Sequence, residues 1–257
     1  MKTGFIFYSN FVYKVLKNIP DQEKIQNEIT SELWPEFMFH DPVSNANWHK
    51  LFELFPEFQI SLMSDGEVIG IANCIPYYWN NSFEKLPDRG WDWVFGKGIN
   101  DKLNKIRANT LNGLQIAVSK KHQGKGISSL VLKEMISLAR DNGFKYVTTP
   151  VRPILKSEYP LTSIDSYIKW RREDGLPFDP WLRVHVRLGG KIIKPCHKSM
   201  YITGTVNEWE EWTNMKFFET GRYVVRGTLK PVRINIEKNR GEYTEPNVWV
   251  LHEVDHK

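Results

Sequence analysis

The feature that most restricts the fold of this 257-residue sequence is a strand, a glycine turn, a helix and a second strand within residues 114–151. Leu114, Ile116 and Val118 alternate with Gln115 and Ala117, as in a strand with one apolar face. Residues 146–151 are again rich in β-forming side chains. Strands joined by one helix in so short a span are parallel neighbours with a right-handed crossover. The sequence therefore predicts a sheet that contains a parallel pair and carries a helix.

The helix inside this unit has a continuous apolar stripe and a defined end. Asn142-Gly143 is typical of a left-handed cap that terminates a helix. The stripe consists of Ile127, Leu130, Val131, Met135, Leu138 and Ala139.

Upstream, the patterns predict helices followed by a hairpin. Asp21 is expected to cap a helix whose apolar residues are Ile25, Ile29 and Leu33. A second helix is expected to end at Phe55, before Pro56. Asp65-Gly66 predicts the turn of a hairpin between residues 58–62 and 68–75. Residues 5–16 are expected to form a strand or a short helix rather than a signal peptide.

Downstream, the signals are less regular. Residues 79–110 fit no single period and are interpreted as an insertion that covers a substrate cleft, although a short helix could lie within them. A helix is expected over residues 163–174. For residues 180–188, apolar alternation favours a strand, whereas Asp179, Pro180 and Gly189 favour a helix, and we predict the helix. Residues 191–257 are expected to form strands.

Composition excludes several classes of protein. The balance of 35 Lys and Arg against 30 Asp and Glu gives a net charge of +5, which on its own does not identify a partner. No basic and aromatic cluster of the kind that binds nucleic acid is present, and no apolar stretch is long enough to span a membrane. Cys74 and Cys196 are far apart, and no histidine pair has metal-ligand spacing. We expect a cytoplasmic protein without a metal, a nucleic-acid partner or a membrane anchor.

The glycine turn is the strongest functional signal. Gly124 and Gly126 allow the backbone N–H groups to converge at the start of a helix, which favours an anion. The spacing does not match a P-loop, and the dinucleotide-binding fingerprint is broken at Ser129.

The residues Gln123-x-x-Gly126-x-Ser128, placed after a strand, resemble the Gln/Arg-x-x-Gly-x-Gly/Ala signature of the GNAT superfamily of acyl-CoA N-acyltransferases. The order of the predicted elements also resembles that family from about Asp21 to about Gly190. The last motif position departs from the pattern, because Ser128 replaces glycine or alanine. The resemblance implies an α+β fold with a mixed central sheet flanked by helices. Residues 1–190 would form the core, with the insertion at about 79–110, and residues 191–257 would complete or extend the same domain.

The resemblance also implies that acetyl-CoA is the co-substrate. The N–H groups from Gly124 to Ser128 would bind the pyrophosphate, and the strand 116–118 would pair with the pantetheine chain. The residues expected to bind coenzyme A are Ile116, Ala117, Val118, Gln123, Gly124, Lys125, Gly126, Ile127 and Ser128.

Direct acyl transfer needs a deprotonated amine and a proton for the departing thiolate. By resemblance, His185 stands four residues before Gly189, where the family often has a tyrosine that gives this proton. Tyr201, another side chain or water are the alternatives. Asp88, Asp92 and Glu67 are candidate bases for the amine. The rings expected to flank the acceptor cleft are Trp34, Trp79, Trp91 and Trp93.

The resemblance implies transfer of an acetyl group from acetyl-CoA to a primary amine of a small molecule or peptide. The alternative is a non-catalytic module that binds or senses acyl-CoA on the same fold. A homodimer is allowed by either hypothesis. The enzyme and the non-catalytic module are distinguished by whether free thiol appears when acetyl-CoA is incubated with an amine.

Overall fold

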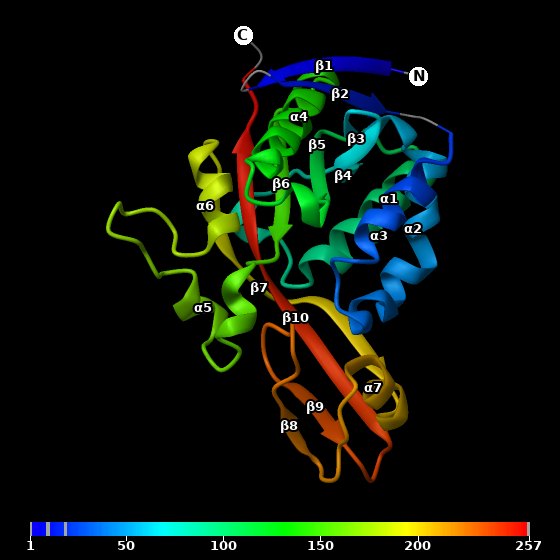
Figure 1. Cartoon of the computed structure of the whole chain (residues 1–257), viewed down its shortest axis with the longest axis vertical. Coiled ribbons are helices and arrows are strands. Elements are labelled where there is room, and N and C mark those ends of the chain that lie inside the picture. Colours follow the sequence, from blue (N-terminus) through cyan, green and yellow to red (C-terminus); the bar gives the residue numbers. More distant parts are fainter. Residues whose placement is uncertain (1, 9–10, 18–19, 256–257) are drawn as a thin grey trace.

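The computed structural model describes residues 2–8, 11–17 and 20–255, which form a mixed sheet flanked by helices (Figure 1). The strands follow one another across the sheet in the order β1-β2-β3-β4-β5-β6-β10-β9-β8, and β7 pairs with β10. β5 and β6 are parallel, and the other pairs are antiparallel. The strands are β1 (Lys2–Tyr8), β2 (Phe11–Lys17), β3 (Gln59–Ser64), β4 (Glu67–Tyr77), β5 (Thr110–Val118), β6 (Tyr146–Val151), β7 (Lys191–Gly204), β8 (Gly221–Tyr223), β9 (Val232–Asn235) and β10 (Arg240–Glu253).

Helices cover both faces of the sheet. A Cβ on Gly70 of β4 would meet Val131 of the helix after β5, whereas Asn73 bonds Gln26 of the first helix. Residues three apart on a strand point to opposite faces, so these two helices lie on opposite sides. The helices are α1 (Gln22–Thr30), α2 (Pro42–Leu54), α3 (Gly90–Leu103), α4 (Ile127–Asp141), α5 (Ile164–Tyr167), α6 (Pro180–Arg187) and α7 (Val206–Thr213).

The elements around the glycine turn form as expected. All six residues of the predicted α4 stripe are buried, and Gly143 ends the helix with a φ of 74°. Residues 180–187 are helical because the Asp179 side chain accepts from the N–H groups of Trp181 and Leu182. The mixed α+β fold is confirmed. The segment 5–16 falls in β1 and β2, with residues 9–10 outside the described part.

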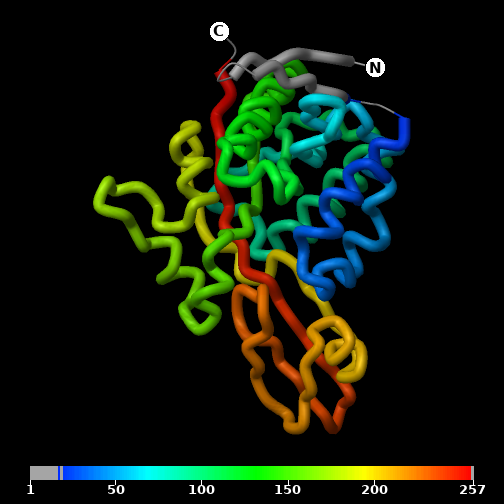
Figure 2. Tube along the Cα trace, viewed as in Figure 1, coloured from blue at the N-terminus to red at the C-terminus, as the bar shows by residue number. Residues whose placement is uncertain are grey.

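The short helix considered within residues 79–110 is present as α3, whose Trp91, Val94 and Phe95 are buried in the main core. Two local expectations were wrong. Asp21 makes no side-chain cap, because its own φ of 54° is left-handed. The helix expected over 163–174 is only the single turn α5, after which the chain bends through Gly175. Figure 2 shows this stretch as a long excursion beside the sheet before α6 returns to it.

The C-terminal part contributes to two cores. Trp249 of β10 and Cys196 of β7 belong to the main core. Farther along the same two strands, Ile202 and Tyr243 pack with Trp209 of α7 in a second cluster. That cluster lies in the portion that projects from the lower end of the molecule in Figure 1.

Candidate active site

The parallel strands β5 and β6 separate after a short paired stretch. Beyond it, the edge of β5 that faces β6 has no strand partner in the described residues, although its other edge pairs with β4. Backbone N–H and C=O groups are thus left for a ligand to pair with. The paired residues are Thr110↔Tyr146, Leu111↔Val147 and Asn112↔Thr148.

A bulge in β5 lies at the start of this opening. Asn73 of β4 pairs with Gln115, and the next residue, Cys74, pairs with Gly113, so Leu114 is the extra residue. The Leu114 carbonyl instead accepts from Trp91 Nε1 at 2.9 Å. The bulge turns Gln115 toward the α1 face, whereas Gly113 faces Met135 of α4.

The open edge of β5 leads into the glycine turn. Gly124 and Gly126 have φ angles of 76° and 77°, and no side chain caps α4. None of the amide groups from Gly124 to Ser128 has a protein partner among the described residues. Gln123 Nε2 donates to the Val118 carbonyl at 3.2 Å and so ties the turn to β5. Free amides at a helix start form a cradle for phosphate, and a Cβ on Gly124 would occupy open space there.

The predicted coenzyme A residues therefore lie along one continuous path. Ile116, Ala117 and Val118 are on the separating part of β5, and residues 123–128 follow directly. The turn is exposed except for Ile127, which anchors it in the core, and half-buried Ser128. These residues fit a molecule with a pyrophosphate at one end and an amide chain at the other.

On the α1 face, Trp34 lies across the gap between the separated strands. Its Nε1 donates to Gln115 Oε1 of β5 at 3.1 Å. The guanidinium carbon of Arg152, the residue after β6, lies 5.9 Å from the centre of the Trp34 ring. Because Trp34 contacts both sides of the opening, it forms a wall of the space where an acceptor would meet coenzyme A.

A buried chain of amide side chains holds Gln115 in place. Gln115 Nε2 donates to Asn73 Oδ1, and Asn73 Nδ2 donates to Gln26 Oε1 of α1. Gln22 and Gln59 extend this chain to the backbone of β3 and β4. The α1 face against the sheet is therefore polar, and the expected apolar face of Ile25 and Ile29 is only half-buried.

A buried ion pair stands beside Trp34. Arg152 Nε donates to both oxygens of Glu245, at 2.9 and 3.1 Å, and Glu245 is completely buried. Tyr243 and Asn247 also donate to this carboxylate, so its charge is fully partnered. The ion pair joins the end of β6 to β10.

Asp92 of α3 and Asp41, the N-cap of α2, form a buried carboxyl pair. Burial and the charge of Asp41 raise the pKa of Asp92 to about 8, and burial raises the pKa of Asp41 as well. Asp92 also accepts from the Tyr201 N–H at 3.2 Å. Two carboxyl groups in one buried site cannot both ionise easily, so the pair shares a proton at neutral pH.

We expect Asp92→Asn to flatten the decline of stability with rising pH. The pKa of Asp92 is above its ordinary value of 3.8, so between pH 3.8 and about 8 the fold binds a proton that the unfolded chain has lost. Stability then falls with rising pH by at most about 1.4 kcal/mol per pH unit. Urea unfolding of wild type and variant across this window measures the difference. Equal slopes for the two proteins would contradict a shared proton.

His185 is completely buried on α6. Its Nδ1 lies 3.0 Å from Nε2 of His252 on β10, and its Nε2 has no partner among the described residues. Burial lowers the pKa of His185 well below 6.5 and that of His252 to about 4. Both rings are therefore neutral at pH 7.

Tyr201, the alternative proton donor, lies at the surface, unlike His185. It is 37% exposed on the outer part of β7, where its hydroxyl donates to Glu242 at 2.7 Å and accepts from Arg240. No contact joins Tyr201 to His185 within the part of the chain that the structure describes.

The remaining predicted cleft rings and candidate bases lie in different parts of the structure. Trp79 and Trp93 contact each other in an aromatic cluster beside the main core. Glu67 is exposed at the hairpin turn, 3.6 Å from Lys121. Asp88 binds His197.

Sequence reasoning missed Gln115, Arg152 and Glu245, for which the only signal was a polar or charged residue within or next to a buried strand.

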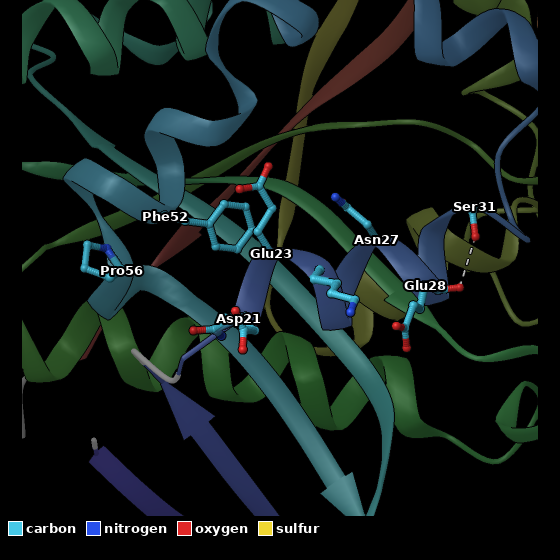
Figure 3. A pocket seen from close by; sticks show the side chains of 9 residues that line it. Asp21, Glu23, Asn27, Glu28, Ser31, Phe52 and Pro56 are labelled. Atoms are coloured by element: carbon cyan, nitrogen blue, oxygen red, sulfur yellow. Dashed lines mark hydrogen bonds between the residues drawn. The ribbon is translucent and has the colours of Figure 1, made fainter.

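A surface groove of about 730 Å³ runs along the outer side of α1 and contains none of the predicted site residues (Figure 3). Asp21, Glu23 and Glu28 line it with Lys24, and Phe52 closes one side. The groove is open, and its charged groups are on the surface. Gln22 is the buried polar residue of its lining, and the side chain of Gln22 is bonded to β3.

Two searches of the described residues were negative. No three His, Cys, Asp or Glu residues within 2–8, 11–17 and 20–255 are arranged to hold a metal ion. Over the same residues, no helix combines the length and apolar character needed to cross a bilayer.

Known proteins resemble this chain in sequence and in fold. It is 29% identical over 252 residues to the arginine N-acetyltransferase avaD of Aspergillus versicolor, covering 87% of this chain and 86% of that protein. The loading GNATL domain of CurA from Lyngbya majuscula superposes with a TM-score of 0.63 and 17% identity, covering 95% of this chain and 99% of that one. The GphF GNAT-like decarboxylase bound to isobutyryl-CoA gives a TM-score of 0.56 and 14% identity, with 94% and 99% covered. The two structures show a shared fold.

The model of the acetyltransferase (GNAT) family matches residues 20–154, more than half of the chain. That span includes α1, the hairpin, the separating strand β5 and the glycine turn. The resemblance to the GNAT family is thus confirmed, and a non-catalytic acyl-CoA sensor is not favoured. The chain belongs to the GNAT acetyltransferase family and transfers an acetyl group from acetyl-CoA to an amine.

Proposed function

We propose that the acceptor is a basic amino acid, with arginine as the first compound to test. The full-length relative named arginine N-acetyltransferase supports this choice. We further propose that the protein acts in the cytoplasm on a free small molecule, without a nucleic-acid or membrane partner, and that a homodimer is compatible with this activity.

The proposed coenzyme A site is carried by one observation, the unpaired edge of β5 that runs into the free amides of residues 124–128. The pyrophosphate would accept from these amides, and the pantetheine amides would pair with Ile116 and Val118. Acetyl-CoA supplies the thioester that the amine attacks. The bulge at Leu114 then lies at the narrow end of the opening, where the thioester would stop.

The acceptor would approach from the α1 face, beneath Trp34. The hydrogen bond to Gln115 and the contact with Arg152 hold the Trp34 ring, so it excludes water without having to rotate. Water exclusion favours attack by the amine over hydrolysis of the thioester.

The surroundings of His185 argue against its predicted role as the proton donor. A completely buried ring with a pKa well below 6.5 carries no readily given proton at pH 7. We therefore expect His185→Gln to keep turnover within about tenfold of wild type, whereas a positioned acid contributes about 10²- to 10⁴-fold. Steady-state turnover at saturating substrates decides, provided that chemistry limits the rate. A loss in the larger range would restore His185 as the donor.

An acceptor screen with thiol detection tests the proposed function. We expect free coenzyme A to appear with arginine and the product to gain one acetyl group by mass spectrometry. Agmatine, lysine, an aliphatic monoamine and a peptide serve as comparison acceptors. If the monoamine or the peptide is acetylated and arginine is not, a basic amino acid is not the acceptor.

A further inference from the structure

A cavity of about 170 Å³ lies where the segment after β6 meets β7 and β10. Its apolar walls include Leu229 and Pro246. Its charged lining consists of Lys156, Lys230, Asp165 and His197. A water molecule takes about 30 Å³ in the liquid, so the cavity has room for a small oxyanion.

Lys156 is the unusual member of this lining, because it is a completely buried lysine. Its ammonium donates to the carbonyl oxygens of Tyr159 at 2.7 Å and Leu229 at 2.5 Å. No carboxylate lies within 4.0 Å of it in the described part of the chain. Burial lowers the pKa of Lys156 to about 8, which reflects a charge without a counterion. A buried charge of this kind is costly unless something pairs with it.

Lys230 adds a second ammonium to the same cavity. It follows Leu229, whose carbonyl already accepts from Lys156. Lys230 is half-buried, and among the described residues it too has no ion-pair partner within 4.0 Å. Burial and the nearby positive charge of Lys198 lower its pKa, although the charge of Asp88 opposes this.

Asp165, the one carboxylate in the lining, already pairs with His197. Asp165 contacts His197 Nε2 at 2.9 Å, and Asp88 holds the other ring nitrogen at 3.0 Å. Burial opposes the charge on His197, but its bonds to Asp165 and Asp88 outweigh this and raise its pKa. His197 carries one positive charge against the two carboxylates of Asp165 and Asp88, so with Lys156 and Lys230 protonated the group keeps an excess of one positive charge.

We propose that this cavity binds a small oxyanion, of the carboxylate or phosphate type, between Lys156 and Lys230. Lysine ammonium groups bind such anions as point charges through charge-assisted hydrogen bonds. The oxyanion could come from two sources: the carboxylate of an amino-acid acceptor, in which case the inference rests on the proposed function, or a free anion. The chemistry of recognition is the same for both.

The first experiment uses sodium sulfate as the probe and the full chain, with sodium chloride at equal ionic strength as reference. Calorimetry is expected to show saturable sulfate binding that weakens by about 10- to 100-fold in Lys230→Ala and in Lys156→Met. Lys216→Ala is the matched control, because Lys216 is an exposed lysine paired with Glu210 on the surface. If Lys156→Met does not fold, the sulfate affinity of Lys230→Ala still tests the proposal, because Lys230 is partly exposed. Unchanged sulfate affinity in Lys230→Ala would overturn the proposal.

A second experiment separates the two sources by comparing arginine with agmatine, which lacks the carboxylate. If the acceptor supplies the anion, Lys230→Ala raises KM for arginine by about 10- to 100-fold and leaves KM for agmatine unchanged. If a free anion binds, both KM values are unchanged and only sulfate affinity falls. The sulfate measurement needs no turnover, so it still stands if neither compound is acetylated and the proposed function fails.

Discussion

Replacing Gly124 by leucine is expected to lower coenzyme A affinity by about 100-fold or more, as measured by calorimetry. Gly124 has a φ of 76°, and the space where its Cβ would lie is open. The Cβ of a leucine would therefore lie in open space, and the rest of its side chain would enter the proposed pyrophosphate cradle. Hydrogen bonds to a charged group contribute about 1.5–3 kcal/mol each, and losing two of them gives the stated factor.

Gly143→Leu is the matched control for the backbone strain that any side chain suffers at a positive φ. Gly143 lies at the other end of α4, has a φ of 74° and also has nothing within 4 Å of its Cβ position. Both variants are thus expected to lose a similar, small amount of stability. If Gly143→Leu weakens coenzyme A binding as much as Gly124→Leu does, the effect is strain and the cradle is refuted.

Breaking the Arg152–Glu245 pair is expected to have the largest effect on stability. Arg152→Met leaves a completely buried carboxylate without its cationic partner, which costs about 3–5 kcal/mol. The variant also removes the cation above the Trp34 ring, so KM for the acceptor should rise. Urea unfolding and steady-state kinetics measure the two effects.

The double variant Arg152→Met with Glu245→Met is the sharper measurement. Removing both charges leaves no unpaired ion, so the double variant should be more stable than Arg152→Met alone. Lys191→Ala, which breaks the exposed pair of Lys191 with Glu253, should leave the unfolding midpoint nearly unchanged. Equal unfolding midpoints for the Arg152 and Lys191 variants would show that the buried pair is not structural.

Local signals predicted the parts of the fold where one face is apolar or a cap is present. The α4 stripe specified its helix, and the Asp179 cap with Gly189 outweighed the strand-like alternation of residues 182–188. Periodicity was least informative where polar residues share the buried face of a helix. The buried face of α3 includes Asp92, Gly98 and Asp101 beside its apolar residues, so the apolar stripe that marks it in the sequence is interrupted.

Other differences arise because tertiary contacts override local preference. α1 turns Gln22 and Gln26 to the sheet because β3 and β4 present carbonyl and amide partners that an apolar side chain could not satisfy. The helix expected over 163–174 stops early because Trp170 and Phe178 pack together, which requires the chain to reverse between them.

In the candidate site, too, residues that are contiguous in sequence could be predicted, and residues that meet only through tertiary contacts could not. The proposed coenzyme A turn could be located in the sequence because its glycines and the start of α4 are contiguous. Glu245 and Arg152 lie 93 residues apart, and no spacing rule joins them. The His185–His252 contact likewise spans 67 residues, and the burial that lowers the pKa of His185 could not be read from the sequence around it.

A crystal structure with coenzyme A bound tests the central claim most directly. We predict that the pyrophosphate lies on the amides of Gly124 to Ser128 and the pantetheine chain along the unpaired edge of β5. The sulfur is expected beside the bulge at Leu114, on the far side of the opening from Trp34. Coenzyme A bound elsewhere, for example in the groove along α1, with β5 and β6 still lacking a ligand between them, would contradict it.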